Sequence, residues 1–230
     1  MATCLICQTE VGETLSIKDI LWLRTLTTRS ICTSCEATFT TIPAQRACAQ
    51  CGRYQDNQEV CQDCQRWRKI PGVVQLQNRA IYQYTPAMKA YMQQYKFNGD
   101  LRLASVFKTQ VQHAIHAAKV DVVVPIPVSS GTFAERGFNQ AVELIGPSTL
   151  VCEALEVTSV YKTQQSKQDR RNRMTRTQPF AIKPKYAARL RDKRILIFDD
   201  VYTTGRTLHF AAQALQTVEA TSMVGLTLAR

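Results

Sequence analysis

From residue 79 onward, apolar positions follow two alternating spacings. Short runs of mainly β-branched residues predict strands at 80–84, 121–127, 194–198 and 222–228. Apolar positions three or four apart predict helices at 86–95, 101–118, 138–145 and 207–218. The stretch between 127 and 138 is rich in small residues, so we expect a loop there. Strands that alternate with helices predict a mostly parallel, doubly wound α/β sheet.

The first seventy residues carry a different pattern, built on cysteine. Eight cysteines form four Cys-x-x-Cys pairs: Cys4/Cys7, Cys32/Cys35, Cys48/Cys51 and Cys61/Cys64. A two-residue gap lets one tight turn direct two thiolates at a single ion, and two such turns complete the tetrahedral shell that zinc prefers. Four pairs therefore predict two zinc sites. Consecutive pairs make the simplest sites, while a cross-braced arrangement that mixes the first and third pairs stays open.

These zinc sites are predicted to be structural, because four sulfur ligands leave no open coordination position for chemistry. The apolar residues at 20–26 offer too little area for a core of their own, so metal binding would supply much of the folding free energy of this module. We therefore expect a double zinc ribbon at 1–70 and an α/β domain at 71–230. The ninth cysteine, Cys152, is flanked by Val151 and Leu155 and is expected to be a buried core residue.

The charge is concentrated in one stretch of the chain. Lysine plus arginine number 29 against 18 acidic residues, for a formal charge of +11. Between Lys162 and Arg194, twelve basic residues face only Asp169 and Asp192, which places +10 there. Such a concentrated cation indicates a polyanion, either nucleic acid or a phosphorylated ligand; the alternative is a solvated loop. The candidate nucleic-acid residues are Lys162, Lys167, Arg170, Arg171, Arg173 and Arg176.

The expected location is the cytoplasm. No apolar run approaches the roughly 18 residues that a membrane span needs. The first residues lack the basic segment and apolar core of a signal peptide, and nine cysteines without an export signal suit a reducing compartment. Any membrane association would be peripheral and would come through partners.

The segment from Ile195 to Thr207 carries the clearest chemistry outside the cysteines. An apolar strand ends in Asp199 and Asp200, and a loop of threonines and glycine then opens a helix. In open α/β sheets, ligands bind beyond the carboxyl ends of the strands. The loop amides and the helix N-terminus suit a phosphate, and the two acids suit paired hydroxyl groups such as those of a ribose.

This segment resembles the PRPP motif of type I phosphoribosyltransferases, in which an apolar strand leads to Asp-Asp and then Thr-Thr-Gly-x-Thr. The resemblance implies that Asp199 and Asp200, the candidate catalytic residues, hold the ribose hydroxyls. It also implies that the segment after Pro125 faces the pyrophosphate and its Mg²⁺. The residues implied to hold the 5′-phosphate are Thr203, Thr204, Gly205, Arg206 and Thr207.

Further motifs resemble the ComF family of competence proteins. They are VPIP at 124–127 leading to ERGFNQ at 135–140, YKFNGD at 95–100 and LAR at 228–230. The resemblance covers essentially the whole chain. It implies a double zinc ribbon joined to a phosphoribosyltransferase-like domain, with Arg136 and Asn139 in the site and the basic stretch in the position of a hood. The alternative for Arg136 is a surface arginine, and the alternative for Asn139 is an ordinary residue at a helix N-terminus.

Three functions follow as competing hypotheses. By the resemblance, the chain takes part in uptake of transforming DNA, binding single-stranded DNA beside a ComFA-like helicase or ATPase. A second hypothesis is a salvage phosphoribosyltransferase that transfers phosphoribose to a base. The third is a structural adaptor for a partner ATPase. No hood segment plainly recognises a purine or pyrimidine, and zinc is unnecessary for salvage chemistry, so the second hypothesis is the weaker. The sequence leaves phosphoribosyl transfer itself undecided.

Overall fold

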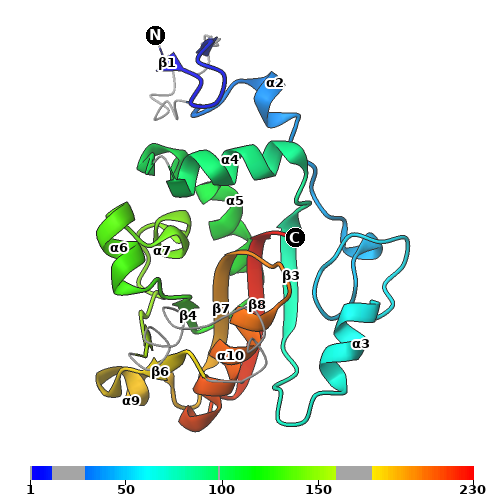
Figure 1. Ribbon diagram of the computed structural model, residues 1–230, viewed down its shortest axis with the longest axis vertical. Helices are drawn as coiled ribbons and strands as arrows, with labels where there is room; N and C mark the ends of the chain where they lie inside the picture. Colours follow the sequence, from blue (N-terminus) through cyan, green and yellow to red (C-terminus); the bar gives the residue numbers. More distant parts are fainter. Residues whose placement is uncertain (1, 12–28, 98, 159–177) are drawn as a thin grey trace, which may run out of the picture.

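A parallel four-stranded sheet lies at the centre of the chain, in the strand order β3-β8-β7-β4 (Figure 1). The computed structural model describes residues 2–11, 29–97, 99–158 and 178–230. The sheet strands are β3 (Gln77–Tyr82), β4 (Val122–Pro125), β7 (Arg194–Val201) and β8 (Ser222–Ala229). In the register of the sheet, Ile197 pairs with Gly225 on one side and with Val124 on the other. The predicted α/β class with a parallel sheet is confirmed.

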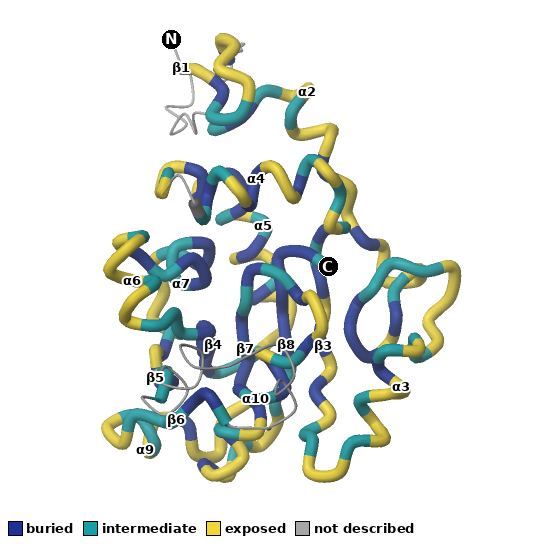
Figure 2. The backbone as a smooth tube through the Cα atoms, viewed as in Figure 1, coloured by how far each residue is buried: buried dark blue, intermediate teal, exposed yellow. Residues whose placement is uncertain are grey.

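Both faces of the sheet are buried, which explains the nearly continuous apolar runs of its central strands. Residues Leu196 and Phe198 of β7 share a core with one set of helices, and Ile195 and Ile197 share a second core on the opposite face. On the first face lie α4 (Pro86–Phe97), α5 (Ala104–Ala117) and α7 (Gln140–Ile145). On the second lies α10 (Arg206–Leu215). Figure 2 shows the buried centre of the sheet between these layers.

The remaining elements are short and lie around this centre. The strands are β1 (Ala2–Thr3), β2 (Glu10–Val11), β5 (Leu155–Val157) and β6 (Phe180–Ile182). The helices are α2 (Thr33–Glu36), α3 (Gln62–Arg68), α6 (Ser130–Arg136) and α9 (Ala187–Leu190). Single 3-10 turns span Ala44–Arg46, Leu101–Leu103, Pro184–Tyr186 and Gln216–Val218. None of the described helices combines the length and the apolar character that crossing a bilayer requires.

The structure differs from the sequence expectation most clearly between 127 and 138, where helix α6 replaces the predicted loop. The Ser129 side chain caps this helix by accepting from the Thr132 N–H at 3.1 Å, and Gly137 ends it with a φ of 81°. The helix buries none of its residues, so it leaves no apolar periodicity in the sequence. Capping groups therefore define this element instead of a hydrophobic face. The antiparallel β5–β6 pair was likewise not predicted.

Several boundaries move by a few residues. The first predicted strand of the domain lies at β3, three residues earlier than expected, while β7 runs on through both aspartates to Val201. Helix α7 begins at Gln140 because Asn139 caps it, accepting from the Ala141 N–H at 2.9 Å. The helix expected at 101–118 divides into a 3-10 turn and α5.

The second half of the cysteine-rich region is joined to the edge of the sheet. The Asn78 N–H of β3 donates to the Gln50 carbonyl at 2.7 Å, and the Gln50 side-chain amide donates to the Leu76 carbonyl at 2.8 Å. Gly52 has a φ of +73°, and a Cβ there would lie 2.6 Å from the Ala80 nitrogen. Glycine is needed because the two backbones approach so closely. The region therefore covers an edge strand that would otherwise be open.

Candidate functional site

The eight paired cysteines form two groups of four. In each group the sulfur atoms all lie within 4.8 Å of one another. The first cluster consists of Cys4, Cys7, Cys32 and Cys35, and the second of Cys48, Cys51, Cys61 and Cys64. Consecutive pairs thus meet, and the cross-braced alternative is wrong for this fold. Each cluster has the donor set and the proximity to hold a zinc ion.

The first cluster lies at the end of the molecule beside α2 and above α4 (Figure 1). Cys32 caps α2, with its sulfur accepting from the Cys35 N–H at 3.4 Å, and the Cys7 and Cys32 sulfurs are 3.6 Å apart. The hydroxyl of Thr9 lies 3.0 Å from the Cys7 sulfur, and this hydrogen bond is the main cause that lowers the pKa of Cys7 to about 6. Local donors thus already favour a thiolate here.

The second cluster is more deeply buried, with only Cys61 partly exposed. The Cys61 N–H donates to the Cys48 sulfur at 3.3 Å. A hydrogen bond from Cys64 lowers the pKa of Cys51 to about 5, and the same bond, followed by burial, raises the pKa of Cys64. The thiols therefore oppose one another's ionisation. A divalent cation would let all four be thiolates together, so this donor set fits zinc.

The candidate acid pair lies at the carboxyl end of β7. Asp200 is buried, and the Lys96 ammonium of α4 reaches its carboxylate at 2.7 Å. Burial, and after it the neighbouring Asp200, raises the pKa of Asp199 to about 8. Sequence reasoning did not assign a role to Lys96, although it stands inside the YKFNGD motif that carried the family resemblance. Tertiary packing of α4 brings this cation to the acids.

The loop after β7 turns into α10 as the sequence predicted. Gly205 precedes the helix with a φ of +84°, and a Cβ there would overlap the Tyr202 ring. Both conditions require glycine at this position. The side chains of Thr203, Thr204 and Thr207 are exposed around the helix N-terminus, with Arg206 half-buried beside them. The Thr204 hydroxyl accepts from the Arg206 N–H at 3.4 Å, and exposed hydroxyls at a helix N-terminus are a set of groups that suits a phosphate.

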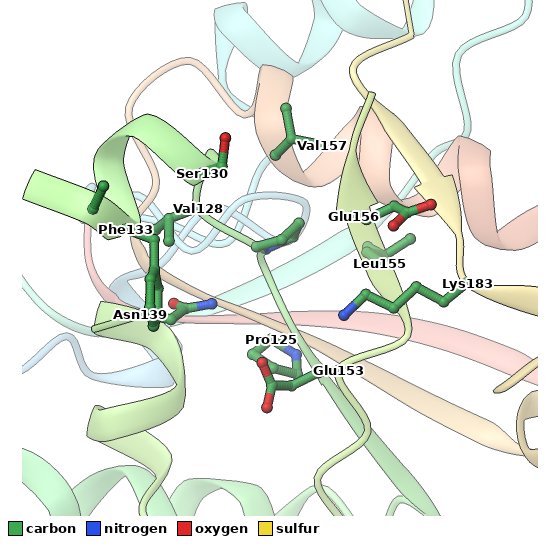
Figure 3. A pocket seen from close by; sticks show the side chains of 12 residues that line it. Pro125, Val128, Ser130, Phe133, Asn139, Glu153, Leu155, Glu156, Val157 and Lys183 are labelled. Carbon is green, nitrogen blue, oxygen red and sulfur yellow. The ribbon is translucent and has the colours of Figure 1, made fainter. Parts of the chain in front are cut away.

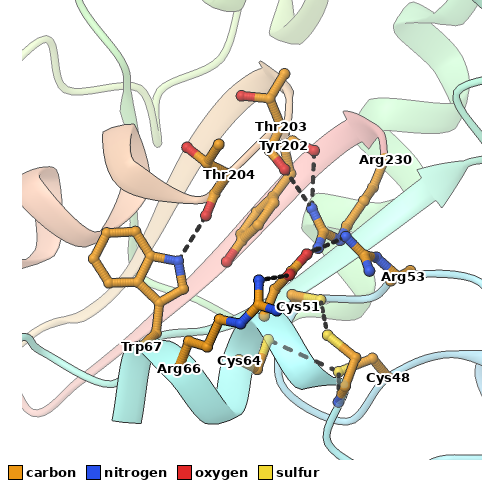
Figure 4. A network of polar contacts seen from close by, with 12 residues as sticks. Cys48, Cys51, Arg53, Cys64, Arg66, Trp67, Tyr202, Thr203, Thr204 and Arg230 are labelled. Carbon is orange, nitrogen blue, oxygen red and sulfur yellow. Dashed lines mark hydrogen bonds and ion pairs between the residues drawn. The ribbon is translucent and has the colours of Figure 1, made fainter. Parts of the chain in front are cut away.

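Two residues that the sequence did not indicate, Trp67 and Arg230, donate hydrogen bonds to the carbonyls of this loop (Figure 4). The Trp67 indole N–H of α3 donates to the Thr204 carbonyl at 2.7 Å. The Arg230 guanidinium donates to the carbonyls of Tyr202 at 3.1 Å and Thr203 at 2.8 Å. Arg230 belongs to the LAR motif at 228–230, which was the only sequence signal for it.

An open pocket of about 420 Å³ lies beside the carboxyl end of β4, the strand next to β7. Figure 3 shows Phe133 and Asn139 on one side of it and Glu156 and Lys183 on the other. The Asn139 amide also donates to the Ile126 carbonyl at 3.0 Å, so its polar atoms serve the backbone as well as the pocket. Arg136 ends α6 nearby in sequence and does not line this pocket. Site roles for both residues stay predictions.

The six candidate nucleic-acid residues, from Lys162 to Arg176, lie outside the described residues. Cys152 and His209 lie within the described part of the chain. Cys152 is buried, as expected, and burial raises the pKa of its thiol. His209 is buried in α10, where its Nδ1 lies 2.8 Å from the Val74 carbonyl.

Comparison with known proteins agrees with this architecture. Residues 104–229 match the phosphoribosyl transferase domain family, so the α/β part of the chain is a phosphoribosyltransferase domain. The chain is 33% identical over 239 residues to "Competence protein ComFC" of Bacillus subtilis (strain 168), covering 99% of this chain and 94% of that protein. It is 32% identical over 228 residues to "Competence protein ComFC" of Streptococcus pneumoniae (strain ATCC BAA-255 / R6), covering 99% of each. The chain belongs to the ComFC family.

Proposed function

We propose that this protein is a cytoplasmic competence factor that handles incoming single-stranded DNA and binds a phosphorylated ribose, of the PRPP type, at the carboxyl end of β7. The single observation that carries the ligand is the continuity of one element: an acid pair, a glycine-anchored loop and the N-terminus of α10 follow one another without a break. The family relationship supports the competence role. In this function both cysteine clusters hold structural zinc.

The site suits the two ends of a phosphorylated ribose. Asp199 and Asp200 provide acceptors for the ring hydroxyls, and the Thr203–Thr207 segment provides donors for the 5′-phosphate. Lys96 adds a cation next to the acids, 2.7 Å from Asp200, which favours a ligand that also carries negative charge. A pyrophosphate with Mg²⁺ would face the segment after Pro125, on the neighbouring strand.

Calorimetry with PRPP and Mg²⁺ tests this site. We expect Asp199→Asn together with Asp200→Asn to abolish binding, because the shape is kept and the acceptor charge is lost. Glu219→Gln is the control, since it neutralises one carboxylate just before β8, at the amino end of the parallel strands and away from the acid pair. PRPP binding that survives the double substitution, or is absent from the unaltered protein, contradicts the proposal.

A second candidate function is transfer of phosphoribose to an acceptor, and the pocket beside β4 favours it. The pocket joins an apolar lining, including Val128 and Leu155, to the carboxyl groups of Glu153 and Glu156. An amine-bearing ring would match that mixture. PRPP turnover with a panel of bases distinguishes this activity from ligand binding alone.

Without turnover, the site would serve sensing or assembly with a ComFA-like helicase or ATPase partner. Copurification of the two proteins tests this role.

A further inference from the structure

We propose that the second cysteine cluster supports the loop at residues 202–205, here named the phosphate loop for its proposed ligand, and that Trp67 and Arg230 are the positioning residues through which it does so. The inference rests on the proposed phosphate site and adds to it a mechanism of control: metal occupancy at one cluster sets the affinity for phosphorylated ribose. Nothing in the acid pair or the loop sequence requires a zinc module. The coupling comes from contacts made across the edge of the sheet (Figure 4).

Hydrogen bonds to the loop carbonyls fix the direction of the loop amides. Three consecutive carbonyls, those of Tyr202, Thr203 and Thr204, accept hydrogen bonds from Arg230 or Trp67. In a planar trans peptide, the C=O of one residue and the N–H of the next point in opposite directions. Holding these carbonyls toward the cysteine region therefore turns the N–H groups of residues 203–205 away from it. Successive amides that point one way form an anion site.

The guanidinium of Arg230 is a buried positive charge. Its side chain is only 4% exposed, its guanidinium lies 4.2 Å above the Tyr202 ring, and its Nε has no hydrogen-bond partner among the described residues. A buried cation of this kind needs nearby negative charge. The carboxylate of Asp63, on α3, lies 3.9 Å away. A metal held by four thiolates keeps a net negative charge, so the occupied cluster would stabilise Arg230 in place.

Helix α3 joins the second cluster to the loop. Cys61 occupies the N-cap position of this helix and Cys64 lies within it, so two of the four cysteines of the cluster belong to α3. Trp67 follows three residues after Cys64, and its ring packs on His209 of α10 with centroids 4.6 Å apart. The same side chain therefore contacts the loop and the helix that the loop opens. Displacing α3 would release both.

If Trp67 and Arg230 position the loop, their substitution should weaken binding of ribose 5-phosphate and leave binding of Mg²⁺-pyrophosphate unchanged. Trp67→Phe keeps the ring and removes the N–H, so ribose 5-phosphate should bind about fivefold more weakly, the value of one net hydrogen bond. Arg230→Lys loses a two-carbonyl contact and should weaken it about tenfold or more. Mg²⁺-pyrophosphate, which does not use the loop, should bind unchanged. Arg53→Lys is the matched control, because Arg53 pairs with Asp63 but contacts no loop carbonyl in the described structure.

A second measurement reads the loop without any ligand. ¹⁵N order parameters of the amides of residues 203–205 should fall in Trp67→Phe and Arg230→Lys and stay unchanged in Arg53→Lys. Cys48→Ser, which removes a ligand of the second cluster, should lower them too, whereas Cys32→Ser in the first cluster should not. Where Cys48→Ser does not fold, the Trp67 and Arg230 variants decide the matter.

The outcomes separate this inference from the proposed function. Unchanged order parameters and unchanged ribose 5-phosphate affinity in both Trp67→Phe and Arg230→Lys would overturn the coupling. Equal weakening of ribose 5-phosphate and Mg²⁺-pyrophosphate would also overturn it, because general loosening and not loop positioning would then explain the loss. Absence of PRPP binding by the unaltered protein, with order parameters that still fall in the variants, would overturn the proposed ligand and support the coupling.

Discussion

The two cysteine clusters share one chemistry and differ in what surrounds them. In the first, Cys7 is exposed and Cys32 and Cys35 are partly so, while in the second three of the four cysteines are buried. The first cluster joins the core on the face of α4 and α5, where nearby Phe39 packs edge-on against Tyr91 and Phe107. The second joins the core on the face of α10.

This difference predicts how far the loss of each cluster would be felt in the rest of the domain. The first cluster orders a region that contacts the outer helices of the domain, at a distance from the phosphate loop (Figure 1). The second is bonded to the edge strand β3 and, through α3, to the loop itself. Two clusters built from the same Cys-x-x-Cys pairs therefore have different neighbours: one lies against the outer helices, and the other lies against the loop before α10.

The largest expected effect is metal loss at the second cluster. Cys64→Ser should remove one of two zinc equivalents and lower the thermal midpoint of the whole domain, because the free energy of a structural zinc is about 10 kcal/mol or more. Cys35→Ser should also remove one equivalent, with PRPP affinity retained. Metal analysis, calorimetric unfolding and PRPP titration measure the three quantities. Equal loss of PRPP affinity in both variants would erase the distinction between the clusters.

The second prediction separates the second cluster from the sheet without touching a ligand. Gly52→Ala combines a φ of +73° with a Cβ placed 2.6 Å from the Ala80 nitrogen, so either β3 or the turn at Cys48–Gly52 must shift. We expect a loss of about 3 kcal/mol or more in urea unfolding. Gly72→Ala has the same φ with open space around the Cβ and is the control, expected to cost about 1 kcal/mol. Similar losses would show that the close docking contributes little.

The third prediction asks where single-stranded DNA binds. If the arm from Lys162 to Arg194 makes about five phosphate contacts, log K should fall against log salt with a slope of roughly −3.5. Neutralising Arg170, Arg171 and Arg173 together should flatten that slope by about two, measured by fluorescence anisotropy over a salt series. An unchanged slope would move the DNA contact from the arm to the cysteine clusters.

The smallest expected effect is a pH dependence at the acid pair. The ribose hydroxyls need an ionised acceptor, and the pKa of Asp199 is raised to about 8. Deprotonation therefore costs free energy below pH 8, and PRPP affinity should rise about fivefold from pH 7 to 8 and then level off. Sulfate, whose charge is constant over this range, is the control ligand for the loop. A flat PRPP profile would mean that Asp199 is already ionised in the free protein.

Local spacing in the sequence was enough for the elements whose geometry is local. Four Cys-x-x-Cys turns, the strand that ends in Asp199 and Asp200, and the glycine that opens α10 each depend on neighbours a few residues away. The parallel α/β class followed from the alternation of apolar periods for the same reason. Elements defined by caps or short pairings, namely α6 and the β5–β6 pair, carried no such period and were missed.

Packing alone decided which distant groups meet. The grouping of cysteine pairs required the folded chain, because turns of identical spacing can combine in more than one way. The Lys96–Asp200 ion pair, the Arg230 contacts and the hydrogen bond of Trp67 to Thr204, 137 positions away, depend on how α4 and α3 dock on the sheet. The sequence by itself determined the chemical groups of the loop before α10; tertiary structure decided that a cysteine cluster lies beside it.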